Sequence, residues 1–165
     1  MQTNHNGIGI NEKLTPNGSL AIYKVYPDGR RELHFRDDNL IVSAAKLYIL
    51  SSLYQVGVSS DPITNLQVGT GGTVDPGGLF PYVENPAATG LATYLLTVPT
   101  TYSVNTGNFS VTFIATVDQG TGNGSLITEA GLFKASNLMF NVKNFPGIPK
   151  TSAFGVNFQW TIQMA

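Results

Sequence analysis

Few side chains in this sequence have the chemistry of an acid–base or metal site. The chain has two histidines and no cysteine, which excludes disulfides, thiolate nucleophiles and cysteine-ligated metal centres. His5 lies in a polar N-terminal stretch, and His34 lies in an alternating segment with Glu32 and Arg36 on its own face. Neither histidine has the spacing of a metal ligand. A solvated strand face with small ion pairs is the favoured interpretation of His34.

The acidic residues form no catalytic pattern either. A hydrolase site would have to be assembled from Asp61, Asp75 or Glu84, and no motif surrounds these carboxylates. The sequence lacks a Gly-x-Ser-x-Gly turn, and Asp37 and Asp38 stand where they would cap the start of a helix. We therefore expect a protein without catalytic residues and without a cofactor.

Two glycine-rich segments have a superficial similarity to ion-binding loops. Residues 69–73 (GTGGT) follow a predicted strand as a phosphate loop would, but Val74 stands where a dinucleotide motif needs its third glycine. Asp118 and Glu129 have the spacing of the first and last ligands of a calcium loop, but glycines occupy ligand positions between them. The sequence thus predicts conformational glycines and a β-turn, with no metal site.

The composition describes a single domain with little charge. The chain has 165 residues, of which 12% are charged and 42% hydrophobic, and its net charge is -1. An average soluble domain is about one quarter charged, so much of this surface must be uncharged. There is no global field to attract a polyanion, which argues against nucleic acid as a partner. We find no pattern of a signal peptide or a membrane span.

The first part of the chain predicts a flexible arm, a hairpin and one helix. Residues 1–18 are polar and rich in Gly and Asn, as expected of an arm. Residues 19–26 and 31–36 alternate on either side of a Pro-Asp-Gly turn and predict a β-hairpin. A stretch without Gly or Pro predicts an α-helix over about residues 40–54.

The remainder predicts strands joined by loops. Residues 63–68, 91–98 and 109–117 are short apolar or alternating segments, and residues 69–88 predict a long surface loop. Residues 154–164 alternate most regularly, with an apolar face that includes Trp160. We expect residues 19–165 to form one mainly β domain, an antiparallel β-sandwich or barrel-like fold with a single helix.

The opposite face of the last predicted strand is polar and uncharged. It carries no Lys or Glu to prevent pairing at an exposed edge, so this strand is either paired centrally or packed on another subunit. Together with the low charge, this favours a homo-oligomer, with a trimer or another small ring as the expectation.

Four stretches of the sequence resemble those of small virion proteins of tailed bacteriophages, which are described as tail-fibre-like, neck or collar, or capsid-decoration proteins. The stretches are residues 39–46 (NLIVSAAK), 63–72 (ITNLQVGTGG), 127–133 (ITEAGLF) and 145–151 (FPGIPKT), the last followed by the strand with Trp160. The resemblance implies a β-rich structural component of a virion, commonly trimeric and without catalytic residues, that contacts other tail, neck or capsid proteins.

The residues suggest where such contacts would form. Ile8 and Ile10, two residues apart in the arm, would anchor an extended segment on a neighbouring subunit. Leu132 and Phe133 point to opposite sides of a predicted strand, so that one could face a neighbour or both could fill the monomer core. Tyr82 is a further candidate. Capsid decoration is a close variant of this function, and a carbohydrate-binding receptor module using Tyr82, Tyr94 or Tyr102 as stacking surfaces is an alternative of another class.

Overall fold

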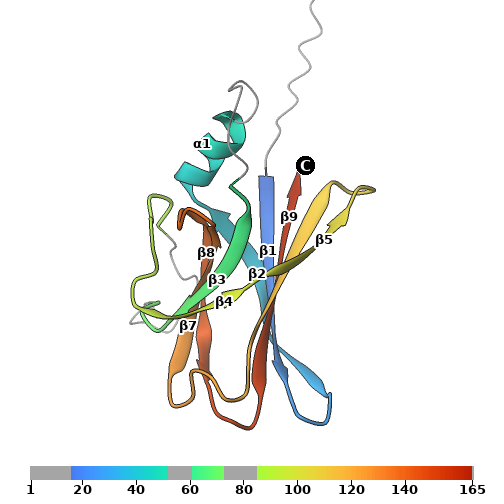
Figure 1. The fold of residues 1–165 in the computed structure, drawn as a ribbon, viewed down its shortest axis with the longest axis vertical. Coiled ribbons are helices and arrows are strands. Elements are labelled where there is room, and N and C mark those ends of the chain that lie inside the picture. The colour runs from blue at the N-terminus through green and yellow to red at the C-terminus, as the bar shows by residue number, and fades with distance from the viewer. Residues whose placement is uncertain (1–15, 52–60, 73–84, 165) are drawn as a thin grey trace, which may run out of the picture.

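A computed structural model describes residues 16–51, 61–72 and 85–164 of the chain. They form nine antiparallel strands and one helix (Figure 1). In chain order these are β1 (Pro16–Val25), β2 (Arg31–Ile41), α1 (Ser43–Ser51), β3 (Ile63–Gly69), β4 (Tyr94–Pro99), β5 (Thr101–Asn105), β6 (Ser110–Val117), β7 (Leu126–Lys134), β8 (Met139–Pro149) and β9 (Gly155–Met164).

The strands make a single, nearly closed, barrel-like sheet in the order β4-β3-β7-β8-β2-β1-β9-β6-β5. β2 bends between two halves of this sheet, because Arg31–Asn39 pairs with β1 while Leu40 and Ile41 pair with β8. On the other side, β4 and β5 follow each other directly through Thr100 and form the two ends of the sheet. The predicted antiparallel β-sandwich or barrel-like fold with one helix is confirmed.

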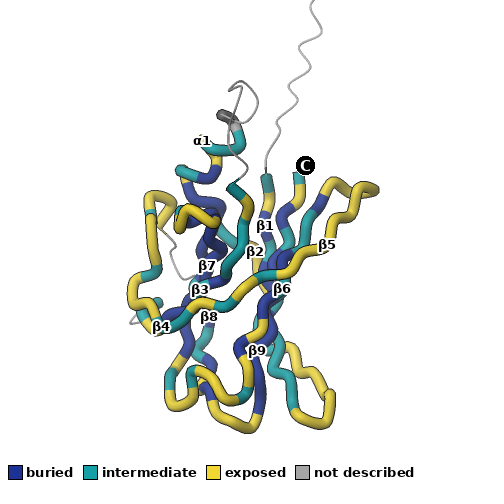
Figure 2. The backbone as a smooth tube through the Cα atoms, in the orientation of Figure 1, coloured by how far each residue is buried: buried dark blue, intermediate teal, exposed yellow. Residues whose placement is uncertain are grey.

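The core lies between the two halves of the sheet. The alternation in β9 predicts this, since Val156, Phe158, Trp160 and Ile162 are all buried and their neighbours along the strand face away. Figure 2 shows the buried segments concentrated in β7, β8 and β9, with exposed segments in the loops and along β4 and β5. Trp160 is fully buried, as its place on the apolar face predicts.

β9 occupies a central position in the sheet. It pairs with β1 on one side over its whole length and with β6 on the other (Figure 1). Of the two explanations for its uncharged polar face, central pairing is the one that the structure shows. The face therefore gives no argument for a contact with another subunit.

The predicted first hairpin is present and longer than expected. β1 begins at Pro16, so residues 16–18, which the sequence assigns to the arm, belong to the sheet. Gly29 closes the turn with a φ of 83°, a conformation that suits glycine, and its N–H donates to the carbonyl of Tyr26 at 3.0 Å. The hairpin thus has the turn chemistry that the sequence indicates.

The predicted start of the helix is wrong. Asp37, Asp38 and Asn39 continue β2 and pair with residues of β1, and the helix begins only at Ser43. Val42 precedes it, and its carbonyl accepts hydrogen bonds from the N–H groups of Ala45 and Lys46. The preference of Asp and Asn side chains for the start of a helix is a local signal. Backbone pairing of these residues with β1 overrides it. The structure describes the helix to Ser51, and the rest of the predicted range lies outside the described residues.

Candidate interaction surface

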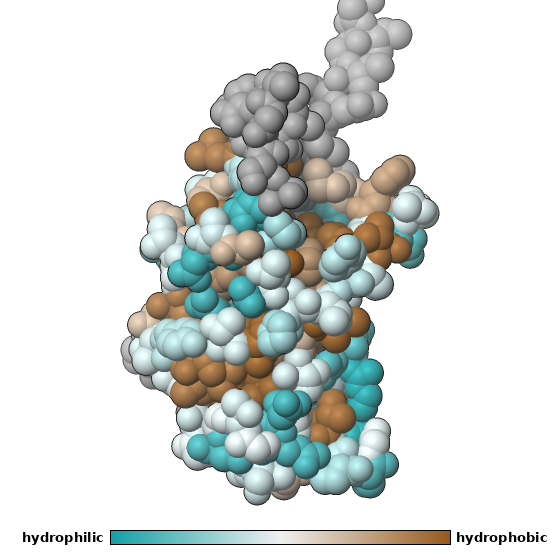
Figure 3. Space-filling model, viewed as in Figure 1, coloured by the Kyte–Doolittle hydropathy of each residue, from teal (hydrophilic) through white to brown (hydrophobic). Residues whose placement is uncertain are grey.

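The end of the sheet formed by β5 is exposed and apolar. All five residues of β5 are exposed, and no strand pairs with its outer edge among the described residues. Tyr102 and Val104 are 69% and 63% exposed, and Phe109, in the turn to β6, is 72% exposed. Figure 3 shows brown, hydrophobic groups on the face where β5 lies. An exposed strand edge of this kind can accept another strand.

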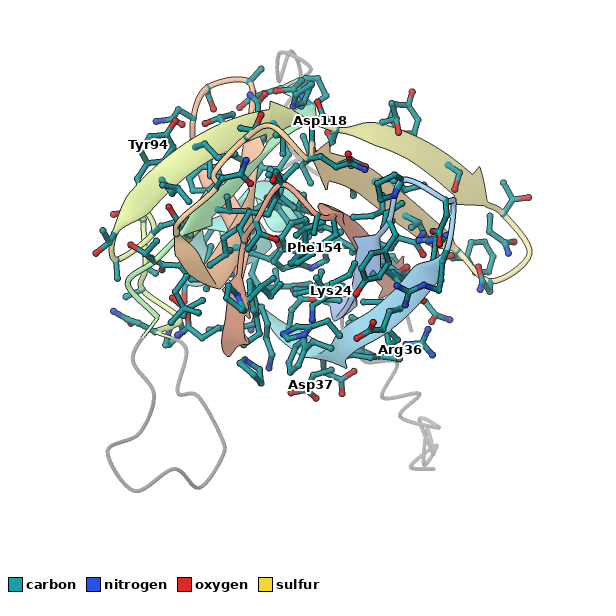
Figure 4. All side chains as sticks on the ribbon, turned by 90° about the horizontal axis from the view of Figure 1, so that it is seen from below. Lys24, Arg36, Asp37, Tyr94, Asp118 and Phe154 are labelled. Carbon is teal, nitrogen blue, oxygen red and sulfur yellow. The ribbon has the colours of Figure 1, made fainter. Side chains whose placement is uncertain are left out.

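The segment that builds this end of the sheet carries no charge. No Asp, Glu, Lys, Arg or His occurs between Glu84 and Asp118, a stretch that includes β4, β5 and β6. Lys24, Arg36 and Asp37, by contrast, lie on the β1–β2 hairpin, across the molecule from Tyr94 of β4 (Figure 4). The edge strands β4 and β5 therefore lack the lysines and other charges with which proteins commonly protect an edge strand.

A cleft of about 380 Å³ lies beside β5. One wall is formed by the β5–β6 hairpin, the other by α1 and the start of β3, and the lining is mostly apolar or aromatic. The main lining residues are Tyr48, Ile63, Tyr102, Val104, Val111, Phe113 and Phe140. Tyr102 leans towards the buried Phe113, with 6.3 Å between ring centroids. The cleft thus continues the apolar face of the exposed edge.

An ion pair borders this cleft. Lys134, at the end of β7, is buried, and its Nζ lies 3.0 Å from Oδ2 of Asp61 and 2.9 Å from the ring centroid of Tyr48. Asp61 also accepts a hydrogen bond from the N–H of Ser136 at 2.9 Å. The side-chain hydrogen bonds from Ser136 and Lys134 hold the pKa of Asp61 below its ordinary value. These contacts make Asp61 part of a structural pair rather than a free base.

The glycine-rich loop after β3 surrounds a carboxylate of the chain itself. Glu129, buried in β7, accepts hydrogen bonds from the N–H groups of Gly71, Ala92 and Thr93 at 2.8–2.9 Å. A Cβ at Gly71 would lie 2.5 Å from the nitrogen of Thr93, so the close approach requires glycine. Within the glycine-rich loop, the N–H of Gly71 therefore binds a carboxylate of the chain itself.

The loop with the calcium-like spacing likewise contacts a cation of the chain itself. Lys150 is buried, and its ammonium donates to the carbonyl of Gln119 at 3.1 Å, to Oδ1 of Asn123 at 2.9 Å and to the carbonyl of Thr151 at 2.9 Å. Burial lowers the pKa of Lys150, and the charge of Asp118 opposes that shift. This loop therefore has a structural role that its spacing alone does not reveal.

The structure places some of the predicted contact residues in the core. Leu132 and Phe133 are 0% and 2% exposed, so both fill the monomer core and neither presents its side chain to a neighbour. Gly131 between them allows β8 to approach closely, since a Cβ there would lie 2.9 Å from the carbonyl of Asn141. Ile8, Ile10 and Tyr82 lie outside the described residues.

The remaining sequence candidates have structural partners or stay apart. Nε2 of His34 lies 3.0 Å from the carbonyl oxygen of Pro146, and the contact is partly buried. Asp37 forms an ion pair with Lys143 at 2.9 Å. Within residues 16–51, 61–72 and 85–164, no three His, Asp or Glu side chains are grouped as metal ligands would be. Asp75 and Glu84 lie outside the described residues, and His5 does too.

Sequence reasoning missed the edge strand itself. Tyr102 is recognised only as a potential stacking residue, and Val104 is not recognised, although the absence of charge between Glu84 and Asp118 was available as a signal. The sequence places Phe109 on the apolar face of the predicted strand 109–117, and this is wrong, because β6 begins at Ser110 and Phe109 lies in the turn before it with its side chain exposed. The ion pair between Lys134 and Asp61 joins residues far apart in the chain and has no local signature.

The structure contains no helix long and apolar enough to span a membrane within the described ranges. Comparison of the chain with protein-family models, with curated proteins and with solved structures finds no match.

Proposed function

We propose that this chain is a non-enzymatic structural component of a tailed-bacteriophage virion. In this proposal it forms a small homo-oligomer, most simply a trimer, and docks on the tail, the neck or collar, or the capsid exterior through protein contacts. Capsid decoration, in which the oligomer cements neighbouring capsid proteins, is the close variant. Two observations support this role: the resemblance of four sequence stretches to tailed-phage virion proteins, and an exposed apolar surface that could bind other subunits.

The exposed, uncharged end of the sheet is the observation that carries the proposal. Tyr102, Val104 and Phe109 are large apolar side chains that remain more than half exposed in the single chain. The neighbouring strand edge has no partner within the described residues. Burial of such a surface against other subunits removes apolar area from water and completes the backbone hydrogen bonds of β5. Repeated around a symmetric particle, modest contacts of this kind become strong.

A particle assay tests the virion role. Electron microscopy of the source virions with an antibody or gold label on this chain should show label at a fixed position on every particle. Light scattering at micromolar concentration should show more than one chain per particle in solution. Unlabelled virions would overturn the virion role, and a monomer across that concentration range would overturn the homo-oligomer.

A carbohydrate-binding receptor module is the second candidate, and two exposed tyrosines favour it. Tyr94 is 59% and Tyr102 is 69% exposed, and aromatic rings of this kind can stack on sugar rings. A glycan array should then show binding that both Tyr94→Ala and Tyr102→Ala abolish, while Leu126→Ala, at another exposed apolar residue, leaves it intact. An array without any signal would exclude this candidate for the glycans that it displays.

A further inference from the structure

We propose that β5 and the cleft beside it bind the N-terminal arm of a second copy of this chain. The arm, residues 1–15, would add as a tenth strand outside β5, with Ile8 and Ile10 entering the apolar cleft. This inference rests on the proposed function, because it names the contact through which the copies assemble.

β5 has the features of an acceptor for a strand. Its inner edge pairs with β6 from Thr101 to Asn105, and its outer edge has no partner within the described residues. Tyr102 and Val104 alternate with polar residues and both line the cleft. Side chains of an added strand that stand opposite these two residues would face the same cleft, because cross-strand neighbours share a face.

The arm has the complementary pattern. In the segment Gly7-Ile8-Gly9-Ile10 the two isoleucines fall on one side of an extended chain and the glycines on the other. Their spacing of two residues equals that of Tyr102 and Val104, so both pairs can meet along one strand. No Asp, Glu, Lys or Arg occurs from Met1 to Asn11, so the segment around Ile8 and Ile10 brings no charged side chain into the cleft, where the charges of Asp61 and Lys134 are already paired with each other.

The position of β1 makes a neighbouring subunit the natural acceptor. Pro16 pairs with Met164 at the end of β9, so β1 starts at one rim of the barrel (Figure 1). A residue that precedes proline is biased towards extended backbone. In this proposal an extended Thr15 carries the arm onward in the direction of β1, beyond the rim of its own barrel. Fifteen residues reach at most about 50 Å when extended, which is enough to span to an adjacent barrel.

Exchange of arms would also produce a closed ring of subunits. If each subunit donates its arm to the next and accepts the arm of the previous one, the contact is heterologous and closes when the rotation between subunits allows it. A trimer is the smallest ring of this kind with distinct neighbours on both sides. The exposed β5 edge of every subunit would then be covered.

Disulfide trapping tests this proposal in the full chain, which has no cysteine of its own. The double variant Ile8→Cys/Val104→Cys should form covalent dimers and larger species on mild oxidation, visible on a non-reducing gel and lost on reduction. The matched control is Ile8→Cys/Leu126→Cys, because Leu126 is an exposed apolar residue at 53% exposure outside the cleft. It should stay monomeric on the same gel.

The other outcomes overturn the proposal in distinct ways. An intramolecular disulfide in the double variant would show that the arm binds its own barrel. Cross-linking by Val104→Cys alone would show that two β5 edges meet directly. Absence of any disulfide, with light scattering still reporting an oligomer, would remove the arm from the contact and leave the proposed function standing. A wild-type monomer in light scattering would instead overturn the homo-oligomer as well.

A second pair of variants gives an independent measurement without oxidation. Val104→Lys places a charge in the cleft and should shift the oligomer towards monomer by at least tenfold in dissociation constant. Leu126→Lys adds the same charge elsewhere and should leave association unchanged. Thermal melting of both variants at low concentration shows whether each barrel is folded. Equal association of the two variants would overturn the role of the cleft.

Discussion

Buried side chains of this protein are stabilised in two ways, by apolar packing or by hydrogen bonds and ion pairs that compensate a buried charge. Trp160 is an example of apolar packing. It is fully buried in β9, opposite Leu20 of β1 and Phe113 of β6, and its indole N–H has no hydrogen-bond partner in the described part of the chain. Its contribution to stability should therefore come from packing and not from a polar contact.

Truncation of Trp160 should be among the most destabilising single changes. We expect Trp160→Ala to lower the free energy of unfolding by about 3–5 kcal/mol, the range for a large buried aromatic. Trp160→Phe should cost less than half as much, because it keeps an aromatic ring and loses no hydrogen bond. Urea unfolding measures both, with Gln163→Ala on the exposed face of β9 as the control. A loss below about 1 kcal/mol for Trp160→Ala would place this face outside the core.

Glu129 is an example of a buried charge that is compensated by hydrogen bonds. Its carboxylate holds three backbone N–H groups from two loops, and hydrogen bonds to a charged group contribute about 1.5–3 kcal/mol each. Glu129→Gln should destabilise the protein by at least about 2 kcal/mol, since the amide turns a donor towards one of these N–H groups. Urea unfolding should show no comparable loss for Glu32→Gln, a half-exposed residue of β2. Equal stability of the two variants would mean that the Glu129 contacts contribute nothing.

The ion pair of Asp61 predicts a pH dependence with a definite sign. The pKa of Asp61 is lowered by hydrogen bonds from Ser136 and Lys134, so the folded state binds the proton less tightly than the unfolded state. The stabilisation is present above the ordinary value of 3.8 and is lost as the pH falls through the lowered pKa. Asp61→Asn should therefore be less stable than wild type at neutral pH, and the difference should narrow in acid.

The measurement for Asp61 is the urea midpoint as a function of pH. The wild-type midpoint should fall more steeply below the ordinary carboxyl pKa than that of Asp61→Asn. Asp38→Asn, at an exposed position of β2, should run parallel to wild type. Parallel curves for wild type and Asp61→Asn would show that the ion pair of Asp61 does not cause the loss of stability in acid.

At the scale of elements, the connection that follows β3 depends on glycines at close approaches. A Cβ at Gly69 would lie 2.5 Å from Oε1 of Glu129 and would also meet the carbonyl of Thr93. Gly69→Ala should therefore destabilise the protein by about 1–3 kcal/mol, the usual cost of overpacking a tight site. Gly90→Ala is the matched control, because nothing lies within 4 Å of a Cβ there. Thermal melting of the two variants compares them, and equal melting temperatures would contradict the close packing around Gly69.

For the whole molecule, the separation of charge predicts how association responds to salt. The charged hairpin of β1 and β2 lies across the molecule from Tyr94, while β4, β5 and β6 carry no charge (Figure 4). If the uncharged end of the sheet is the contact, association should change little between about 0.05 and 0.5 M NaCl and should strengthen in ammonium sulfate. Light scattering across these conditions measures it. Dissociation as NaCl rises would indicate a charged contact, such as the β1–β2 hairpin.

The sequence by itself determined the elements whose signal is local. Strict alternation in β9 gives its buried face and the core position of Trp160, because side chains of a strand alternate between its two sides whatever its neighbours are. The Pro-Asp-Gly turn likewise gives the hairpin of β1 and β2, since the turn residues and the flanking strands are adjacent in the chain. These features, with the short apolar segments of β3 and β6, were sufficient for the fold class.

Only the tertiary structure decided which strands meet and what the remaining residues do. Pairing with β1 keeps Asp37–Asn39 in a strand although their side chains favour a helix start, and pairing on both sides places β9 in the centre and leaves β5 as the edge. Glu129 reaches Gly71 across 58 positions of sequence, and Lys134 reaches Asp61 in the same long-range way. Such contacts depend on the order of strands in the sheet. Alternation specifies a face of a strand but not its neighbour, so the candidate surface at β5 emerged only in three dimensions.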